Sequence, residues 1–463
     1  MRSTRSPPPI RRASMPPADA IFPPGFVWGA ATSAYQIEGA VTADGRGESI
    51  WDVFSHIPGN IIDGSNGDFA CDAYHRFRQD IALMRELGLT GYRFSIAWPR
   101  VFPRGFGALN PAGLDHYRRL VDILLEAGIA PLVTLYHWDL PRPLQSLGGW
   151  ANRDTAARFG EFAHAVAVAL GGEVHDWVTV NEPWVAAFLG NLLGAHAPGL
   201  RDLRVALAAA HHLLLAHAEG MSALRAEMAF GDRAGIALNL APVEPLGDSN
   251  ADAEAAHRFD GCLNRWFLDA LFRGRYPDDM LAWYGDAVPE IRADDLARIS
   301  TPMDLLGVNY YTRNVVRWQP GAQPVDAEVV VRPGVPVSGM GWAVDPEGLF
   351  EVLTRLHTDY TAPPMLVAEN GAAYPDRLVD GVVDDPERER YLHEHLLRVH
   401  RAIETGVPVG GYYVWSLLDN FEWAYGYSQR FGLLYTDFAT QDRIVKRSGH
   451  WYAGVTRANG VRG

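Results

Sequence analysis

The sequence VHDWVTVNEPW occupies residues 174–184 and has the pattern of a short buried strand that stops abruptly at polar residues. Residues 177–180 are aromatic or β-branched, which is typical of a strand covered on both faces in a parallel sheet. Asn181 and Glu182 follow directly, and Pro183 prevents the strand from continuing with a normal ladder bond. Parallel α/β folds bind ligands at the carboxyl ends of their strands, so Glu182 is a candidate functional acid. Taken alone, it is equally well explained as a cap of the next helix.

A second stretch, PMLVAENG at residues 364–371, is built in the same way. Its apolar run ends in Glu369, and Asn370 and Gly371 turn the chain away from the strand. Two strands that each deliver one Glu to a shared face provide what cleavage of a glycosidic bond by paired carboxylates requires. The two motifs together therefore indicate a glycosidase more strongly than either motif alone.

The composition narrows the class of protein. The chain has 463 residues, 48% of them hydrophobic, and a formal net charge of −14. This length suits an α/β barrel with loop insertions, and the hydrophobic content is ample for a large core. The negative charge argues against a nucleic-acid partner, which would require clustered Lys and Arg.

The cysteines and the N-terminal segment indicate the compartment. Cys71 and Cys262 are too few for a disulfide scaffold, and we expect buried free thiols, which suit a reducing, cytoplasmic compartment. Residues 1–20 are rich in Arg, Pro and Ser and lack an apolar segment, so we predict a disordered tail rather than a signal peptide or an anchor. No apolar run approaches the length of a transmembrane helix, and no membrane partner is expected.

Strand-like apolar runs recur along the chain with helical patterns between them, and they predict an α/β fold, a single (β/α)8 TIM barrel with long βα loops at the catalytic face. The expected strands lie at 26–39, 92–98, 131–139, 177–180, 234–239, 304–311, 364–369 and 410–417. The clearest helical patterns lie at 70–87, 114–127, 159–170 and 206–225. We expect the barrel domain to span 21–455, with 456–463 as a C-terminal tail. Residues 318–342 and 417–438 are predicted insertions on the catalytic face.

In a barrel, polar residues at strand ends converge on one mouth. Here they offer hydrogen-bonding groups for nearly every hydroxyl of a sugar and aromatic faces for its C–H surface. Any one of them is as well explained as a cap or a crosslink, whereas the whole set favours a sugar site. The set comprises Gln36, Arg93, His137, Asn181, Glu182, Asn309, Tyr311, Glu369, Trp415, Glu422 and Trp423.

Three of these stretches resemble family 1 glycoside hydrolases, the retaining β-glucosidase family: TVNEP at 179–183, AENG at 368–371 and the segment 26–39. The resemblance extends over about residues 22–452. It implies a (β/α)8 barrel with Glu182 as the acid/base at strand four and Glu369 as the nucleophile at strand seven. Ala368 departs from the family pattern, in which Thr is more usual before the nucleophile.

The resemblance also implies roles for the surrounding residues. Arg93 and Tyr311 are expected beside the nucleophile, with Asn309 in the catalytic group and Asn181 reaching the sugar 2-hydroxyl. The remaining expected substrate-binding residues are Gln36, His137, Trp138, Trp415, Glu422, Trp423, Phe431 and Trp342, with Trp342 and Trp184 on the leaving-group side.

The implied substrate is a small neutral β-D-glucoside, such as a cello-oligosaccharide or an aryl or alkyl glucoside, with β-fucosides and β-galactosides also accepted. Family members that act on 6-phosphosugars replace the acid at the position of Glu422. The alternative for Glu422 is a loop cap or a partner of Arg430.

Electrostatics gives the expected mechanism. Arg93 favours the ionised form of Glu369, and the negative Glu369 raises the pKa of Glu182 until Glu369 is glycosylated. No cofactor and no metal are needed. The competing interpretations are a metal-dependent barrel hydrolase, and a binding module or inactivated homologue that would lack one carboxylate. The sequence leaves the oligomeric state open, including a homo-oligomer.

Two histidine clusters are the competing metal signals. We expect them to lie on solvated or packed helix faces rather than at the barrel mouth. They are His211, His212 and His217, and His393, His395 and His400.

Overall fold

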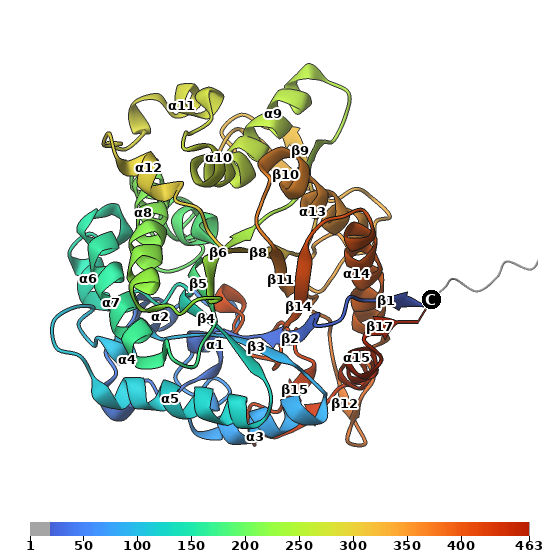
Figure 1. Cartoon of the computed structure of the whole chain (residues 1–463). Coiled ribbons are helices and arrows are strands. Elements are labelled where there is room, and N and C mark those ends of the chain that lie inside the picture. The colour runs from blue at the N-terminus through green and yellow to red at the C-terminus, as the bar shows by residue number, and fades with distance from the viewer. Residues whose placement is uncertain (1–18, 463) are drawn as a thin grey trace, which may run out of the picture.

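Eight short apolar segments pair in parallel and close into a barrel, which stands at the centre of Figure 1. The computed structural model describes residues 19–462. Around the barrel the strand order is β11-β14-β2-β3-β4-β5-β6-β8. The strands are β2 Val27–Ala31, β3 Gly91–Ser95, β4 Ala130–Tyr136, β5 Asp176–Asn181, β6 Arg233–Asn239, β8 Leu305–Tyr310, β11 Met365–Asn370 and β14 Val409–Trp415. The predicted α/β TIM barrel is confirmed.

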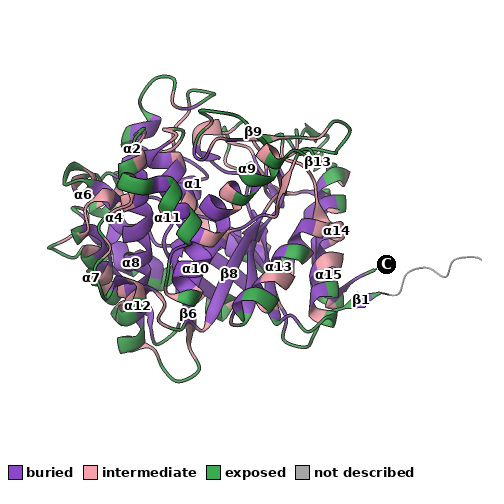
Figure 2. Ribbon diagram, turned by 90° about the horizontal axis from the view of Figure 1, so that it is seen from above, coloured by how far each residue is buried: buried purple, intermediate pink, exposed green. Residues whose placement is uncertain are grey.

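Helices follow each barrel strand and cover the outside of the barrel (Figure 1). The main ones are α3 Ala73–Glu86, α5 Pro111–Glu126, α7 Asp154–Leu170, α8 Leu203–Glu227, α10 Trp266–Arg273, α13 Pro346–Tyr360, α14 Pro386–Glu404 and α15 Arg447–Ala458. The four helices predicted from the sequence are present, with ends that differ by no more than five residues. The barrel strands and the inner helix faces are buried, whereas the outer helix faces are exposed (Figure 2).

The barrel interior is a packed floor beneath the mouth. Its residues come from successive strands and include Ala31, Leu132, Val178, Ala237, Leu305, Leu366 and Tyr413. Gly235 permits close approach of β6 and β8, because a Cβ atom there would lie 1.8 Å from the carbonyl oxygen of Leu305. Side chains from the last residue of each strand therefore rise above a solid floor and meet at one end of the barrel.

Long connections at that end build a second layer of structure. Between β6 and β8 the chain forms β7 Val243–Pro245, α9 Asn250–Asp260 and the π-helical segment η4 Gly261–Arg265. It then returns along the outside of the barrel through α10, α11 Asp278–Tyr284 and α12 Asp295–Ile299 to the start of β8. The predicted insertion 318–342 contains β10 Ala327–Val330, which pairs with β9 Asn314–Trp318 just before it, and these strands join β7 in a three-stranded sheet. The predicted insertion 417–438 contains the turn η6 Trp423–Tyr425. The excursion over 240–303 was not predicted from the sequence.

The expected boundary at residue 455 is wrong. It falls inside α15, and the segment predicted as a C-terminal tail continues into β17 Gly460–Val461, which pairs antiparallel with β1 Ala20–Ile21. The Asn459 side chain accepts a hydrogen bond from Trp28 Nε1 at 2.9 Å, which ties this end to the barrel. Of the predicted N-terminal tail, residues 1–18 lie outside the described residues. Within 19–462, no helix has both the length and the apolar character required to cross a bilayer.

Candidate active site

Glu182 lies at the carboxyl end of β5, where the backbone leaves the sheet. Its φ of 48° is in the left-handed region, which is costly for a residue with a side chain and is typical of functional sites. The Glu182 N–H donates to the carbonyl of Ala237 at 2.9 Å, so β6 holds this strained residue in place. The carboxylate is buried, and Asn309 Nδ2 donates to its Oε1 at 2.7 Å.

Glu369 lies on β11, and its carboxylate is held from two sides. Arg93 Nη1 donates to Oε1 at 2.5 Å, and the Tyr311 hydroxyl donates to Oε2 at 2.6 Å. The Asn309 amide that donates to Glu182 also donates to Asn181 Oδ1 at 3.0 Å, so both of its N–H groups are engaged. The side chains come from four strands and the loops after β5 and β8, and all meet at the predicted end of the barrel.

Asn181 connects these groups to His137. Its Oδ1 accepts from Arg93 Nη2 at 2.6 Å and from Asn309 Nδ2 at 3.0 Å, and its Nδ2 donates to His137 Nε2 at 3.0 Å. Burial lowers the pKa of His137 well below its ordinary value, so the ring is neutral and carries its proton on Nδ1. Nδ1 is buried and has no partner among the described residues, so it can donate to a ligand hydroxyl.

The sequence suggested that Gln36 lies near the end of a strand, but in the structure it does not. The strand stops at Ala31, and Gln36 lies on the short helix α1 Ala34–Ile37. Its Nε2 donates to the carbonyl of Phe421 at 2.9 Å and to Glu422 Oε2 at 3.4 Å. The helix therefore delivers the amide to the loop after β14.

Glu422 is buried at that loop. The alternative partner Arg430 bonds Asp419 instead, at 2.7 Å. Burial, and then the charge of Glu369, raise the pKa of Glu422 to about 8, whereas hydrogen bonds from Trp415 and Gln36 oppose the shift.

These groups surround one cavity of about 540 Å³. Eleven of the fourteen predicted site residues line it: His137, Trp138, Glu182, Asn309, Tyr311, Trp342, Glu369, Trp415, Glu422, Trp423 and Phe431. The other three, Gln36, Arg93 and Asn181, do not line the cavity but hydrogen-bond Glu422, Glu369 and His137, which do.

The sequence interpretation missed part of the cavity wall. The missed residues include Ile62, Asn239, Leu240, Phe259, Leu263 and Met340. Asn239 ends a strand that was predicted, so its position could have identified it. The apolar residues carry no such signal, because nothing in their local pattern distinguishes them from core residues. Trp184, predicted on the leaving-group side, does line the cavity.

The electrostatics of the two carboxylates differ. The pKa of Glu182 is raised to about 8, first by burial and second by the charge of Glu369, so the neighbouring charge is not the main cause that the sequence suggested. Burial also raises the pKa of Glu369, but Arg93 is the largest opposing influence and Tyr311 assists it. The negative charge of the pair is therefore best accommodated on Glu369, and the proton on Glu182.

The two histidine clusters lie in helix packing. His211 bonds the Tyr276 hydroxyl at 2.8 Å and Asp295 at 3.0 Å, and His395 stacks on Tyr391 with ring centroids 3.8 Å apart. Within residues 19–462, no group of three or more His, Cys, Asp or Glu side chains is arranged to hold a metal ion.

The fold and the paired carboxylates define a glycosidase of the TIM-barrel class. A model of glycosyl hydrolase family 1 matches residues 18–461. Beta-glucosidase A of Acetivibrio thermocellus is 47% identical over 446 residues, covering 95% of this chain and 99% of the relative. The bifunctional beta-D-glucosidase/beta-D-fucosidase of Bifidobacterium breve is 47% identical over 454 residues, covering 93% and 97%.

Solved structures agree with the sequence relatives. The beta-glucosidase from Thermotoga maritima in complex with glucoimidazole superposes with a TM-score of 0.92 at 46% identity, over 96% of this chain and 100% of that chain. The chain belongs to glycosyl hydrolase family 1.

Proposed function

We propose that this protein, an O-glycosyl hydrolase of the β-glucosidase type, removes terminal non-reducing β-D-glucosyl residues with retention of configuration. The observation that carries the proposal is that two buried carboxylates at one cavity have different hydrogen-bond partners. Glu369 accepts hydrogen bonds from the cationic Arg93 and from Tyr311, whereas Glu182 accepts one from the neutral amide of Asn309. One group is thereby prepared as a nucleophile and the other as an acid.

In the first step Glu369 attacks the anomeric carbon while Glu182 gives its proton to the leaving-group oxygen, which breaks the glycosidic bond. Glu369 is then a neutral ester, so its charge no longer raises the pKa of Glu182, whereas burial and the charge of Glu422 still do. In the second step Glu182 takes a proton from water, and the water oxygen attacks the anomeric carbon. The bond between this carbon and Glu369 breaks, which releases the sugar and restores the Glu369 carboxylate. Two inversions give net retention.

Groups on opposite sides of the cavity fit the two parts of the substrate. His137 and Glu422, which Gln36 holds, provide a donor and acceptors for sugar hydroxyls, and Trp415 and Trp423 provide aromatic faces. On the other side the wall is largely apolar, with Trp184, Phe259, Leu263, Met340 and Trp342, which suits aryl, alkyl or sugar leaving groups. The proposed substrates are β-D-glucosides, including cello-oligosaccharides, with β-fucosides and β-galactosides cleaved more slowly.

A panel of p-nitrophenyl glycosides tests the proposal, with the product anomer followed by ¹H NMR. We expect the highest kcat/KM with the β-D-glucoside, β-glucose as the first-formed product, and full activity in EDTA. First-formed α-glucose would contradict a covalent intermediate on Glu369. Loss of activity in EDTA, restored by a divalent metal, would favour the metal-dependent alternative.

A further inference from the structure

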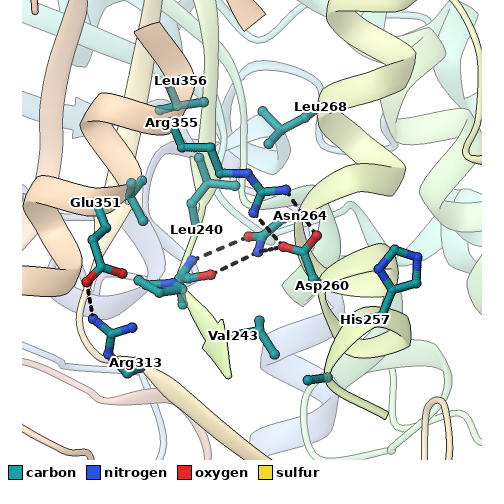
Figure 3. Close-up of a pocket in the computed structure, with 14 residues that line it drawn as sticks. Leu240, Val243, His257, Asp260, Asn264, Leu268, Arg313, Glu351, Arg355 and Leu356 are labelled. Carbon is teal, nitrogen blue, oxygen red and sulfur yellow. Dashed lines mark hydrogen bonds and ion pairs between the residues drawn. The ribbon is translucent and has the colours of Figure 1, made fainter. Parts of the chain in front are cut away.

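Figure 3 shows a second cavity, of about 450 Å³, which adjoins the active-site cavity. The two cavities share a wall, because Leu240 and Ala241 line both of them. This wall follows β6 directly, and β6 is the strand that holds the Glu182 backbone through Ala237. The wall therefore stands on the side of the proton donor, where the leaving group departs.

The charged groups of the second cavity are bonded to one another. Asp260 receives Arg355 through two hydrogen bonds of 2.6 and 3.0 Å, and Arg313 donates to Glu351 at 2.7 Å (Figure 3). Asp260 also accepts from Arg265 at 3.0 Å, so its carboxylate is fully engaged. A polar ligand would have to displace these bonds, so the arrangement is that of a structural support.

Asn264 connects this support to the shared wall. Its side chain is buried, and Nδ2 donates to the Ala241 carbonyl at 2.8 Å and to Asp260 Oδ1 at 2.7 Å. The Ala241 N–H approaches Asn264 Oδ1 at 3.4 Å. The amide thus clamps both backbone groups of Ala241, and Asp260, fixed by Arg355, orients the amide.

The helical segment that carries Asn264 faces the active site with its other residues. Phe259 and Leu263 line the active-site cavity, whereas Asp260 and Asn264 line the second cavity. In the same turn, Cys262 Sγ accepts a hydrogen bond from Trp184 Nε1 at 3.4 Å. One turn therefore holds Ala241 on one side and Trp184 on the other.

We propose that Asn264, oriented by the Asp260–Arg355 pair, is a positioning residue that sets the shape of the leaving-group side of the active site. The inference rests on the proposed function, since it assumes that a glycoside leaving group contacts this wall. Asn264 touches neither the sugar nor the two carboxylates. Substitution of Asn264 should consequently weaken the binding of substrates with large leaving groups more than that of substrates with small ones.

The test compares cellobiose with β-D-glucosyl fluoride in the Asn264→Ala variant. Fluoride is too small to contact the wall, whereas the second glucose of cellobiose must lie against it. We expect KM for cellobiose to rise about tenfold, equivalent to the loss of about one hydrogen bond between the displaced wall and the second glucose, with kcat little changed. For the fluoride, kcat/KM should stay within about twofold of the unmodified enzyme.

A milder second variant, Arg355→Met, leaves Asn264 and the remaining Asp260 bonds in place and should give the same pattern with a smaller shift. The matched control is Glu347→Gln. Glu347 lies on α13, the helix that also carries Arg355, and the substitution removes its ion pairs to Arg398 and Arg401. Glu347 lines neither cavity. This substitution should leave both substrates unaffected. Equal losses on both substrates, or unchanged KM for cellobiose in both variants, would overturn the inference. Failure of the unmodified enzyme to cleave either glucoside would instead overturn the proposed function.

Discussion

The guanidinium of Arg93 lies 2.5 Å from the carboxylate of Glu369, and both side chains are buried. A buried charge without a partner would be strongly unfavourable, so each of these two groups stabilises the ionised form of the other. The same guanidinium donates from Nη2 to Asn181 Oδ1 at 2.6 Å, and the Asn181 side chain is in turn hydrogen-bonded to His137. The charge of the proposed nucleophile is thus linked to the groups that would hold the sugar.

The first prediction concerns the nucleophile. Glu369→Ala should lower kcat on p-nitrophenyl β-glucoside by about 10⁴-fold or more, because the covalent route is lost. Azide should enter the vacated space, restore cleavage and give an α-configured glucosyl azide, which NMR identifies. Near-native activity of the variant without azide would show that Glu369 is not the nucleophile.

The second prediction concerns the proton donor. Glu182→Ala should slow glycosylation by poor leaving groups about 10²- to 10⁴-fold, the usual contribution of general acid catalysis. A dinitrophenyl leaving group needs little protonation, so its glycosylation step should be largely preserved. The measurement is pre-steady-state release of the two phenols. Equal losses for the two leaving groups would contradict the assignment.

The third prediction is a pH dependence. Glycosylation requires protonated Glu182, and its pKa is raised to about 8, so kcat/KM should fall as pH rises through this value. The apparent pKa belongs to the coupled pair of carboxylates. When Glu369 is trapped as a 2-deoxy-2-fluoroglucosyl ester, its charge is lost and the pKa of Glu182 should fall. A ¹³C NMR titration of labelled Glu would detect the shift, and an unchanged pKa would exclude coupling.

The barrel could be predicted from the sequence because its strands are short apolar runs that end at polar or turn residues. The pattern around Glu182 and that around Glu369 are local, and each is visible within about ten residues. The C-terminal strand Gly460–Val461 could not be found in this way. It is two residues long, and only its pairing with Ala20–Ile21, more than 400 positions away, defines it.

Strand positions alone locate part of the cavity wall, whereas the loop residues Trp342 and Phe431 were expected only from the family resemblance. His137 and Asn309 follow from strand positions, whereas Phe259 and Leu263 reach the cavity from a helical turn in the long excursion after β6. Gln36 was found for a partly wrong reason, since a helix and not a strand end carries it. The positions of Phe259, Leu263 and Gln36 are determined by tertiary packing, which no local sequence pattern predicts.

The fourth prediction concerns stability. Lys446, the only lysine in the chain, is fully buried and donates to Asp376 and Asp419. Lys446→Met should lower the free energy of unfolding by about 3–5 kcal/mol, because it leaves buried carboxylates with less compensation. Calorimetric unfolding measures the change. The control is Arg447→Ala, whose pairs are exposed and should contribute little; equal effects of both substitutions would contradict a special role for Lys446.

The sugar site is poor in positive charge, which limits the substrates it can take. No Lys or Arg lines the described cavity, whereas Glu182, Glu369 and Glu422 do. The basic groups near the loop after β14 are engaged elsewhere, since Arg430 and Lys446 both bond Asp419. A sugar phosphate carries close to two negative charges and would find no cation to pair with.

The last prediction follows from this charge distribution. The unmodified enzyme should cleave p-nitrophenyl β-glucoside much faster than its 6-phosphate, since Glu422 meets a phosphate with repulsion when ionised and with a single donor when protonated. Glu422→Ser should lower kcat/KM for the plain glucoside about 10- to 150-fold, the effect of losing one charged hydrogen bond. The same substitution should narrow the preference against the 6-phosphoglucoside. The decisive measurement is the ratio of the two kcat/KM values: a ratio favouring the phosphosugar in the unmodified enzyme would refute a neutral-sugar site, because Glu422 would then not oppose the phosphate.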